Sequence, residues 1–180
     1  ICYDGSETPS RPHKNYPAKL TDWLYERFCA LGAAGGVLVL PCELIDNNAE
    51  KLRGFVCRYA EEWGLGAAFS EWLDKECRFC NTLVDRVVSG YPVSEAAEME
   101  KRFGYRDALI DVCEPFLLWV IDSKEPIDGY LPVSSCGLDI VVTDDFASYR
   151  TRKVRILNGS HTSSVLAGHL CGFETVDQLI

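Results

Sequence analysis

A short, uninterrupted apolar run at residues 37–40 (VLVL) restricts the folds open to this chain. Gly36 precedes the run and Pro41 ends it, a pattern typical of a strand that is buried on both faces. The run lies between two segments whose apolar residues recur with helical spacing. Because helices alternate with a buried strand, the sequence predicts an α/β fold.

Three helices are predicted in the first half of the chain. The first covers residues 17–31 and ends before Gly32, the second covers residues 49–63, and the third covers residues 67–75. The first has a regular apolar stripe, which we expect to be buried and which consists of Leu20, Leu24, Phe28 and Leu31.

The remaining elements are less regular. Residues 1–16 are polar and rich in turn formers, so they predict a loop. A solvated helix is predicted at residues 92–103, and strands at residues 112–121 and 138–142. Pro115 falls inside the first of these strands, where it predicts a bend or an edge position.

The C-terminal segment differs in charge from the rest. Four of the seven residues at positions 149–155 are cationic, and a helix is predicted from Thr151 to about Leu170. We expect a domain boundary here, with residues 1–148 in one domain and 149–180 in the next. The second stretch is too short to fold alone, so we expect it to be the first part of a larger domain.

Composition excludes several classes of protein. The chain has 18 Lys+Arg against 27 Asp+Glu and a pI near 4.8, and a nucleic-acid interface needs a concentrated basic face, so no nucleic-acid partner is expected. No apolar run approaches the roughly 18 residues that span a membrane. The first residues lack the basic and apolar order of a signal peptide. We therefore expect a cytoplasmic protein without a membrane partner.

The nine cysteines are odd in number and irregularly spaced. This pattern favours reduced thiols that fill apolar positions in a cytosolic protein over a disulfide scaffold. Cys77 and Cys80 form one CxxC motif, whereas a structural zinc site needs a second ligand pair at comparable spacing. No metal is expected.

Residues 64–69 (GLGAAF) approximate the glycine-rich GxGxxG motif that binds the pyrophosphate of a dinucleotide. That motif works when it follows a strand and opens a helix, so that the phosphates meet the helix N-terminus. Here the preceding residues are helical. The segment therefore predicts a corner between two helices.

The most informative polar stretch is residues 152–161 (RKVRILNGSH). On an α-helix at about 100° per residue, Lys153, Asn158 and His161 lie at roughly 0°, 140° and 80°, so they share one face. Together they could supply a proton donor, a neutral group that polarises an oxygen, and an orienting group. The alternative is a basic amphipathic helix with Ile156 and Leu157 buried, and spacing alone favours this alternative.

Another polar cluster, residues 41–48 (PCELIDNN), follows the buried strand directly. In open α/β sheets ligands bind beyond the carboxyl ends of strands, which makes Glu43, Asp46 and Asn47 candidate binding residues. Capping of the next helix by Asp46 or Asn48 explains the cluster equally well.

A third polar cluster surrounds Asn81, just before an apolar segment. An N-cap explains this asparagine as well as a ligand contact does. The neighbouring pair Asp85 and Arg86 could form a structural salt bridge.

Taken together, the pattern Asn81-x2-Val84-Asp85-Arg86 and the later Lys153-x4-Asn158-x2-His161 resemble the long-chain mannitol dehydrogenase family of NAD-dependent oxidoreductases. From about Tyr16 to its end, the chain is similar to the tagaturonate reductase (altronate oxidoreductase) branch of that family. Four segments carry this resemblance: residues 16–21 (YPAKLT), 41–48 (PCELIDNN), 83–92 (LVDRVVSGYP) and 153–162 (KVRILNGSHT).

The resemblance implies the later part of a Rossmann-like cofactor domain, followed by the first helix of an all-α C-terminal domain. It implies NAD as cofactor and a small sugar acid as substrate. Family members carry a glycine-rich cofactor motif and a long helical domain that this chain lacks, so we expect an internal fragment. Its partner would be the remainder of the parent chain, and exposed apolar surface would favour self-association.

The resemblance also implies roles for individual residues. Lys153 would be the general acid/base on the carbinol oxygen, Asn81 and Asn158 would hold that oxygen, and His161 would fix a neighbouring hydroxyl group. No metal takes part. From their place after the buried strand, we predict Asp46 as a cofactor contact, together with Asn81, and Glu43 and Asn47 as substrate contacts.

Arginine at position 150 is a further substrate candidate. Helix geometry places Arg150 at about 60°, on the face of Lys153 and His161, and a guanidinium binds a carboxylate through two parallel hydrogen bonds. The expected reaction is the interconversion of D-tagaturonate and D-altronate. The alternatives are a fructuronate reductase or mannitol dehydrogenase of the same family, or a non-catalytic folding or assembly module.

Overall fold

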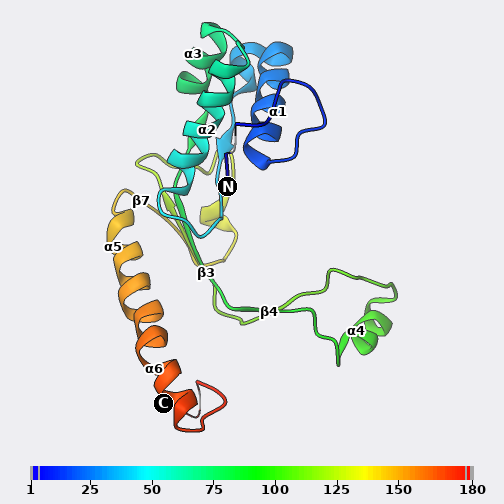
Figure 1. Cartoon of the computed structure of the whole chain (residues 1–180), viewed down its shortest axis with the longest axis vertical. Coiled ribbons are helices and arrows are strands. Elements are labelled where there is room, and N and C mark those ends of the chain that lie inside the picture. Colours follow the sequence, from blue (N-terminus) through cyan, green and yellow to red (C-terminus); the bar gives the residue numbers. More distant parts are fainter. Residues whose placement is uncertain (1, 4, 177, 179–180) are drawn as a thin grey trace.

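The computed structural model describes residues 2, 3, 5–176 and 178, and its first half alternates helix and strand. Helix α1 (Tyr16–Leu31) leads through the 3₁₀ turn η1 (Gly32–Gly35) into strand β1 (Leu38–Val39). Helices α2 (Asn48–Glu62) and α3 (Ala67–Lys75) follow. Figure 1 shows these three helices grouped at one end of the molecule. The predicted helices are thus confirmed. A strand also lies where one was predicted, but it is not buried on both faces: Leu38 and Val39 are half-buried, because their sheet has β2 (Arg78–Phe79) as its other strand and one edge of β1 is left open.

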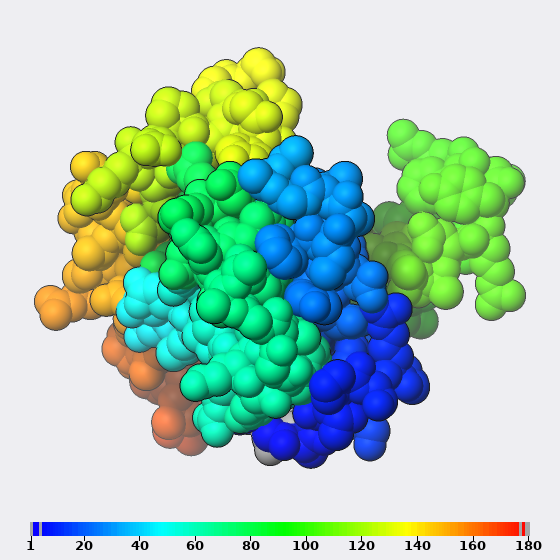
Figure 2. Space-filling model, turned by 90° about the horizontal axis from the view of Figure 1, so that it is seen from above, coloured from blue at the N-terminus to red at the C-terminus, as the bar shows by residue number. Residues whose placement is uncertain are grey.

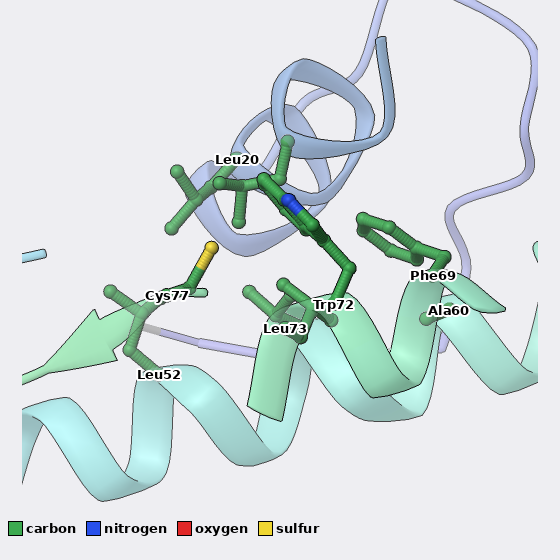
Figure 3. Packing of buried hydrophobic residues seen from close by; sticks show 9 residues of the cluster. Leu20, Leu52, Ala60, Phe69, Trp72, Leu73 and Cys77 are labelled. Atoms are coloured by element: carbon green, nitrogen blue, oxygen red, sulfur yellow. The ribbon is translucent and has the colours of Figure 1, made fainter. Parts of the chain in front are cut away.

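Side chains from α1, α2 and α3 form the main hydrophobic core (Figure 3). Leu24, Leu52 and Phe69 are completely buried in it, and Trp72 donates its indole N–H to the carbonyl of Gly32. Of the predicted stripe of α1, Leu20 and Leu24 are buried and Phe28 is half-buried, whereas Leu31 lies at the end of the helix and is exposed.

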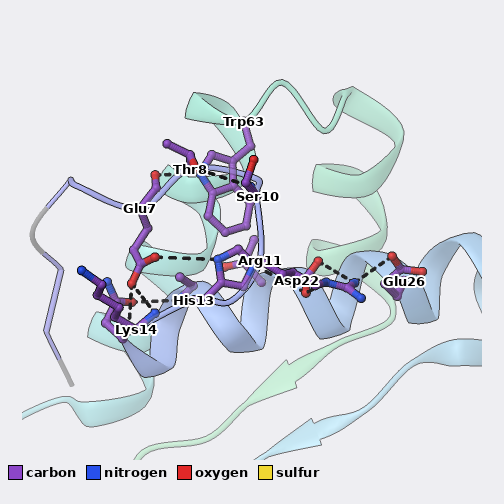
Figure 4. Close-up of polar contacts among 12 residues, drawn as sticks. Glu7, Thr8, Ser10, Arg11, His13, Lys14, Asp22, Glu26 and Trp63 are labelled. Atoms are coloured by element: carbon purple, nitrogen blue, oxygen red, sulfur yellow. Dashed lines mark hydrogen bonds and ion pairs between the residues drawn. The ribbon is translucent and has the colours of Figure 1, made fainter.

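The N-terminal segment is a loop, as predicted, and it is fastened to α1 and α2 by polar contacts (Figure 4). The buried imidazole of His13 lies between the carboxylates of Glu7 (3.8 Å) and Asp22 (3.5 Å) and stacks on Trp63. Arg11 forms a 2.6 Å ion pair with Asp22. These contacts close one side of the helical layer.

Two small sheets meet at the segment that contains strands β2 (Arg78–Phe79) and β3 (Thr82–Asp85). Strand β1 pairs with β2 in parallel, and β3 pairs antiparallel with β6 (Leu118–Asp122). Strand β6 in turn pairs in parallel with β7 (Ile140–Thr143), which confirms the strand predicted there. The carboxyl ends of β1 and β2 therefore lie at the same edge of the sheet, beside the start of β3.

Close backbone contact accompanies the pairing of β1 with β2. A Cβ atom on Gly36 would lie 2.4 Å from the carbonyl oxygen of Glu76, so a glycine is needed where the chain enters β1.

The strand predicted at residues 112–121 is in fact two strands in different sheets. Strand β5 (Val112–Cys113) pairs antiparallel with β4 (Val88–Gly90), whereas β6 joins β3 and β7. Pro115 lies between β5 and β6, which confirms the predicted bend. The strands β2, β3 and β4 were not predicted.

Residues 86–117 form a projecting arm, which consists of the β4–β5 ribbon and the short helix α4 (Ala96–Phe103) at its tip (Figure 1). Seen from above, the tip stands apart from the body (Figure 2). The helix predicted at residues 92–103 begins only at Ala96, because residues 93–95 form a turn. Large apolar side chains of the arm are exposed, including Val93, Tyr105 and Leu109.

The chain ends in one long helical element, composed of α5 (Phe146–Arg152), the π-helical segment η3 (Lys153–Asn158) and α6 (Gly159–Leu170). It projects from the body on the opposite side from the arm (Figure 1). The helix begins five residues before the predicted start at Thr151. The 3₁₀ turn η2 (Val133–Ser135) precedes β7.

All nine cysteines are free, but most of them do not fill apolar positions as expected: six are exposed and Cys57 is half-buried. Cys77 and Cys80 are buried, and burial raises the pKa of both thiols. The GLGAAF segment is a corner between α2 and α3, as predicted, with positive φ angles at Gly64 and Gly66. In the described part of the chain, no helix is long and apolar enough to cross a membrane.

Candidate functional site

The loop that follows β1, residues 41–47, forms one wall of the candidate site. Asn47 ends this loop with φ +52°, which turns the chain into α2. The buried side chain of Asn48 then fastens the loop to β3, because its Nδ2 donates to the carbonyls of Pro41 (2.8 Å), Glu43 (3.1 Å) and Thr82 (3.1 Å).

Neither Asp46 nor Asn48 caps helix α2, so that interpretation is wrong. The cap comes instead from the segment between β2 and β3: Oδ1 of Asn81 accepts hydrogen bonds from the backbone N–H groups of Ala49 (3.0 Å) and Glu50 (3.4 Å). Asn81 therefore caps α2, and not a helix of its own, because the residues after it form β3.

The other amide group of Asn81 is also bonded. Nδ2 donates to Oε1 of Glu50 (3.1 Å) and Oδ2 of Asp122 (3.4 Å). Asn81 is buried, and Nδ2 faces two acidic side chains. The neighbouring Arg86 does not pair with Asp85, but donates from Nε to the carbonyls of Glu114 and Phe116.

The second wall of the site is the helical element, and its π-helical segment changes the predicted geometry. In a π-helix each N–H bonds five residues back, so residues i and i+5 lie about one turn apart. Lys153 and Asn158 have this spacing, and the bond from the Gly159 N–H to the Val154 carbonyl follows the same pattern. In this segment the angle between Lys153 and Asn158 about the helix axis is therefore smaller than the 140° expected for an α-helix.

The alternative of a basic amphipathic helix fails in one respect. It required Ile156 and Leu157 to be buried, but both are exposed, and no residue of α5 or η3 is buried. Lys153 is the half-buried cation of this segment that borders the loop after β1.

Two depressions meet at Lys153. We name the first the loop-side depression; its volume is about 150 Å³, and its lining includes residues 43–47, Thr82, Leu83, Arg150, Lys153 and Asn158. At this size it could hold only part of a dinucleotide or sugar.

Arg150 joins the two walls of the loop-side depression. Its Nη1 donates to Oδ1 of Asn47 (3.4 Å) and lies 3.7 Å from Oδ1 of Asp46. Because a guanidinium has five N–H donors, further donors remain for a ligand. Glu43 and Asp46 add carboxylates to the opposite rim, so the depression presents both signs of charge.

The arm-side depression lies between the helical element and the base of the arm. Its volume is about 520 Å³, within the range of small-molecule sites, and its lining includes Asp85, Glu114, Tyr149, Arg152, Lys153 and His161. A carboxylate or a polyhydroxylated molecule would find donors and acceptors there.

The structure brings most of the candidate residues together, but not all in one place. Lys153 borders both depressions, Asn158 only the loop-side one and His161 only the arm-side one. Asn81 is not among the residues that line either depression.

Sequence reasoning did not assign Thr82, Tyr149 or Glu114 to the site. Thr82 follows Asn81 directly, and its hydroxyl group bonds the Pro41 carbonyl, so its position next to a candidate was the available signal. No comparable signal in the sequence marked Glu114, which lies in the arm, or Tyr149, which lies on α5.

Helices that alternate with parallel strands, and polar residues just beyond the carboxyl end of β1, are typical of a Rossmann-type domain. The family model described as the mannitol dehydrogenase Rossmann domain matches residues 6–134. The chain belongs to this mannitol dehydrogenase family.

Relatives and solved structures agree with this assignment. The chain is 45% identical over 176 residues to an altronate oxidoreductase of Cronobacter sakazakii and 43% identical to one of Escherichia coli. Each match includes 97% of this chain but 36% of the relative, so the chain spans about a third of the relatives' length.

Two solved structures are similar to most of the chain. A D-sorbitol dehydrogenase in substrate-free form matches with a TM-score of 0.71 at 25% identity, over 88% of this chain and 31% of that one. A Pseudomonas fluorescens mannitol 2-dehydrogenase, in a ternary complex with NAD and D-mannitol, matches with a TM-score of 0.59 at 25% identity, over 88% and 32%. The predicted α/β, Rossmann-like fold is thereby confirmed.

Proposed function

We propose that this chain is part of a cytoplasmic, NAD-dependent oxidoreductase that interconverts D-tagaturonate and D-altronate by hydride transfer. The observation that carries the proposal is the place of Lys153, half-buried where the two depressions meet beside the carboxyl ends of β1 and β2. The altronate oxidoreductases at 43–45% identity support the choice of substrate.

The domain organisation is part of the same proposal. Residues 1–148 would belong to the cofactor domain and residues 149–180 to the start of a helical substrate domain. The boundary falls within α5, so a single rigid helix would connect the two domains and carry Lys153 between them.

The residues after β1 fit one end of a dinucleotide. The carboxylate of Asp46 is largely exposed beside the loop-side depression, where it could accept hydrogen bonds from ribose hydroxyl groups. Asn81 lies behind this loop and caps the N-terminus of α2. Through this cap it would support the part of the site that binds this end of the cofactor. When bound, the reduced cofactor supplies the hydride.

Proton transfer would be the task of Lys153. As the hydride reaches the carbonyl carbon of tagaturonate, the ammonium group donates a proton to the carbonyl oxygen, and in the reverse direction the amine accepts it.

Two amides would stabilise the charge that develops on this oxygen. Asn158 lies about one turn from Lys153 and lines the same depression. The side chain of Asn81 would donate from Nδ2. This group would have to give up its hydrogen bond to Glu50 or Asp122 and form one with the substrate oxygen.

The substrate would lie across Lys153, with one end in the arm-side depression, where His161 could fix a neighbouring hydroxyl group, and its carboxylate end at the loop-side depression. Arg150 would bind the carboxylate with the N–H donors that Asn47 and Asp46 do not use, and Glu43 and Asn47 would accept hydroxyl hydrogen bonds. This division of donors favours a sugar acid over a neutral polyol.

The decisive experiment is Lys153→Ala in the full-length protein, measured as NADH-dependent reduction of tagaturonate. We expect kcat to fall by at least about a hundredfold, the lower range for a general acid. Arg155→Ala is the matched control, because Arg155 is an exposed cation of the same segment that lines neither depression. Activity within tenfold of wild type in Lys153→Ala would remove the assignment.

The alternatives separate in simple assays. A fructuronate reductase or a mannitol dehydrogenase would prefer fructuronate or hexitols to tagaturonate in a substrate panel. A non-catalytic assembly module would bind no NADH in calorimetric titration, and the exposed apolar side chains of the arm would then favour self-association.

A further inference from the structure

The side chain of Asn48 holds together two parts of the site that are distant in sequence. It is 1% exposed, and its Oδ1 accepts the backbone N–H of Thr82 at 3.0 Å while Nδ2 donates to three carbonyls. Both sides of the amide are thus satisfied by backbone groups. Such a buried, fully bonded amide fixes the position of what it touches.

What Asn48 fixes is the loop after β1. The bonds to Pro41 and Glu43 attach the beginning of this loop to β3 through Thr82. The end of the loop is Asn47, which is covalently next to Asn48 and in the left-handed region. The side chain of Asn48 therefore holds the beginning of the loop, and the backbone link to α2 holds its end.

This loop in turn holds the helical element. Arg150 on α5 contacts Asn47 and Asp46, as described above. No residue of α5 or η3 is buried, and α5 packs against the body at strand β6. The contact of Arg150 with the loop after β1 is a second point of attachment, so it contributes to where the helix lies.

Lys153 follows Arg150 by three residues, so the two side chains are neighbours on the helix. A shift of the loop that moves Asn47 would move Arg150, and with it Lys153. The contacts form a continuous path from Thr82 in β3 through Asn48 and Asn47 to Arg150.

We propose that Asn48 is a positioning residue, which fixes the loop after β1 and thereby sets the position of the Lys153-bearing helix through Arg150. The proposal rests on the proposed function in so far as Lys153 transfers the proton. It assigns Asn48 no contact with substrate or cofactor. Its distinctive consequence is an effect on residues 146–158, which Asn48 does not touch.

The test uses Asn48→Asp in the full-length protein, followed by hydrogen exchange and steady-state kinetics. Aspartate keeps the size and the acceptor for the Thr82 N–H, but it replaces the Nδ2 donor by an oxygen that faces three carbonyls. We expect exchange in residues 146–158 to rise at least about tenfold, and kcat to fall about tenfold with a change of less than threefold in KM for NADH.

Asn15→Asp is the matched control. Asn15 caps α1 with Oδ1 and donates from Nδ2 to the hydroxyl of Tyr59, so the variant loses an equivalent donor in the helical layer. It should lower the melting temperature and leave exchange in residues 146–158 unchanged. A rise of equal size in both variants would overturn the proposal, because the effect would then be general destabilisation.

Asn47→Gly tests the same path if Asn48→Asp does not fold. Glycine accepts the positive φ of this position and removes the partner of Arg150, so exchange should rise in residues 146–158 and not in α2. Unchanged exchange in residues 146–158 would overturn the proposal. Exchange that rises while kcat stays constant would support the anchoring and count against Lys153 as proton donor, which separates the two proposals.

Discussion

The side-chain oxygen of Asn81 accepts the backbone N–H of Ala49 at 3.0 Å, although 32 residues separate them. Helix α2 is therefore capped by the segment between β2 and β3, rather than by its own preceding loop. One residue thus links the stability of a core helix to the edge of the sheet where the candidate site lies.

Loss of this cap should be measurable in the full-length protein. We expect Asn81→Ala to lower the free energy of unfolding by about 1–2 kcal/mol, because the N–H groups of Ala49 and Glu50 lose their acceptor. Chemical denaturation measures this change. Asn15→Ala, which removes the cap of α1, should cost a similar amount without affecting kcat. A neutral Asn81→Ala would contradict the capping role.

Gly36 should resist substitution. The Cβ atom of Gly36→Ala would meet the Glu76 carbonyl oxygen at 2.4 Å, so the start of β1 must shift, at a cost of about 1–3 kcal/mol. Gly54→Ala is the control within α2, since no atom lies within 4 Å of its Cβ position. That change should stabilise the protein by up to about 1 kcal/mol. Equal midpoints of urea denaturation for the two variants would refute the expected close contact.

Arg150 should control the preference for a carboxylate. We expect Arg150→Lys to reduce the ratio of kcat/KM for tagaturonate to that for a hexitol by about tenfold, because an ammonium group cannot form two parallel bonds. Arg150→Ala should reduce the ratio further. Arg155→Ala should leave it unchanged. If the ratio is the same in Arg150→Ala as in wild type, another residue binds the carboxylate.

The buried thiols should make stability depend on alkaline pH. Burial raises the pKa of Cys77 and Cys80, so the folded state holds these protons more tightly than the unfolded state does. Their contribution is complete below the usual thiol pKa of about 8.5, falls as the pH rises above it, and is lost beyond the raised value.

The measurement is the free energy of unfolding between about pH 8 and pH 10, compared with the double variant Cys77→Ala and Cys80→Ala. The double variant should show a flatter decline, whereas Cys113→Ala, at an exposed position, should follow wild type. Alkylation of the native protein should modify Cys113 well before Cys77. Rapid modification of Cys77 would argue against its burial.

Apolar periodicity made the helical layer and β1 predictable. The stripe that contains Leu20 and Leu24 and the run at residues 37–40 each carry a regular pattern that tertiary contacts reinforce. By contrast, β2 and β4 are two and three residues long and have no period to detect. Strand pairing across long sequence distances decides their structure.

The sequence suggested candidate residues for the site but not their arrangement, and their roles stay predictions. The residues after β1 were candidates because they follow a strand. Lys153 and Asn158 were candidates through the family resemblance, since their spacing alone favoured an amphipathic helix. The cap supplied by Asn81 could not be foreseen, because it depends on which strand lies beside α2. The π-helical segment was also hidden, since bonds from i to i+5 leave no pattern in residue type.

The π-helical segment η3 also accommodates one residue more than an α-helical turn does. Lys153 and Asn158 are five residues apart but about one turn apart, as residues i and i+4 are in an α-helix. Deletion of one residue within η3 would therefore allow continuous α-helical bonding with almost no rotation of α6 about its axis, and His161 would stay on its side of the helix. The extra residue widens the helix locally at Lys153 and leaves the orientation of α6 unchanged.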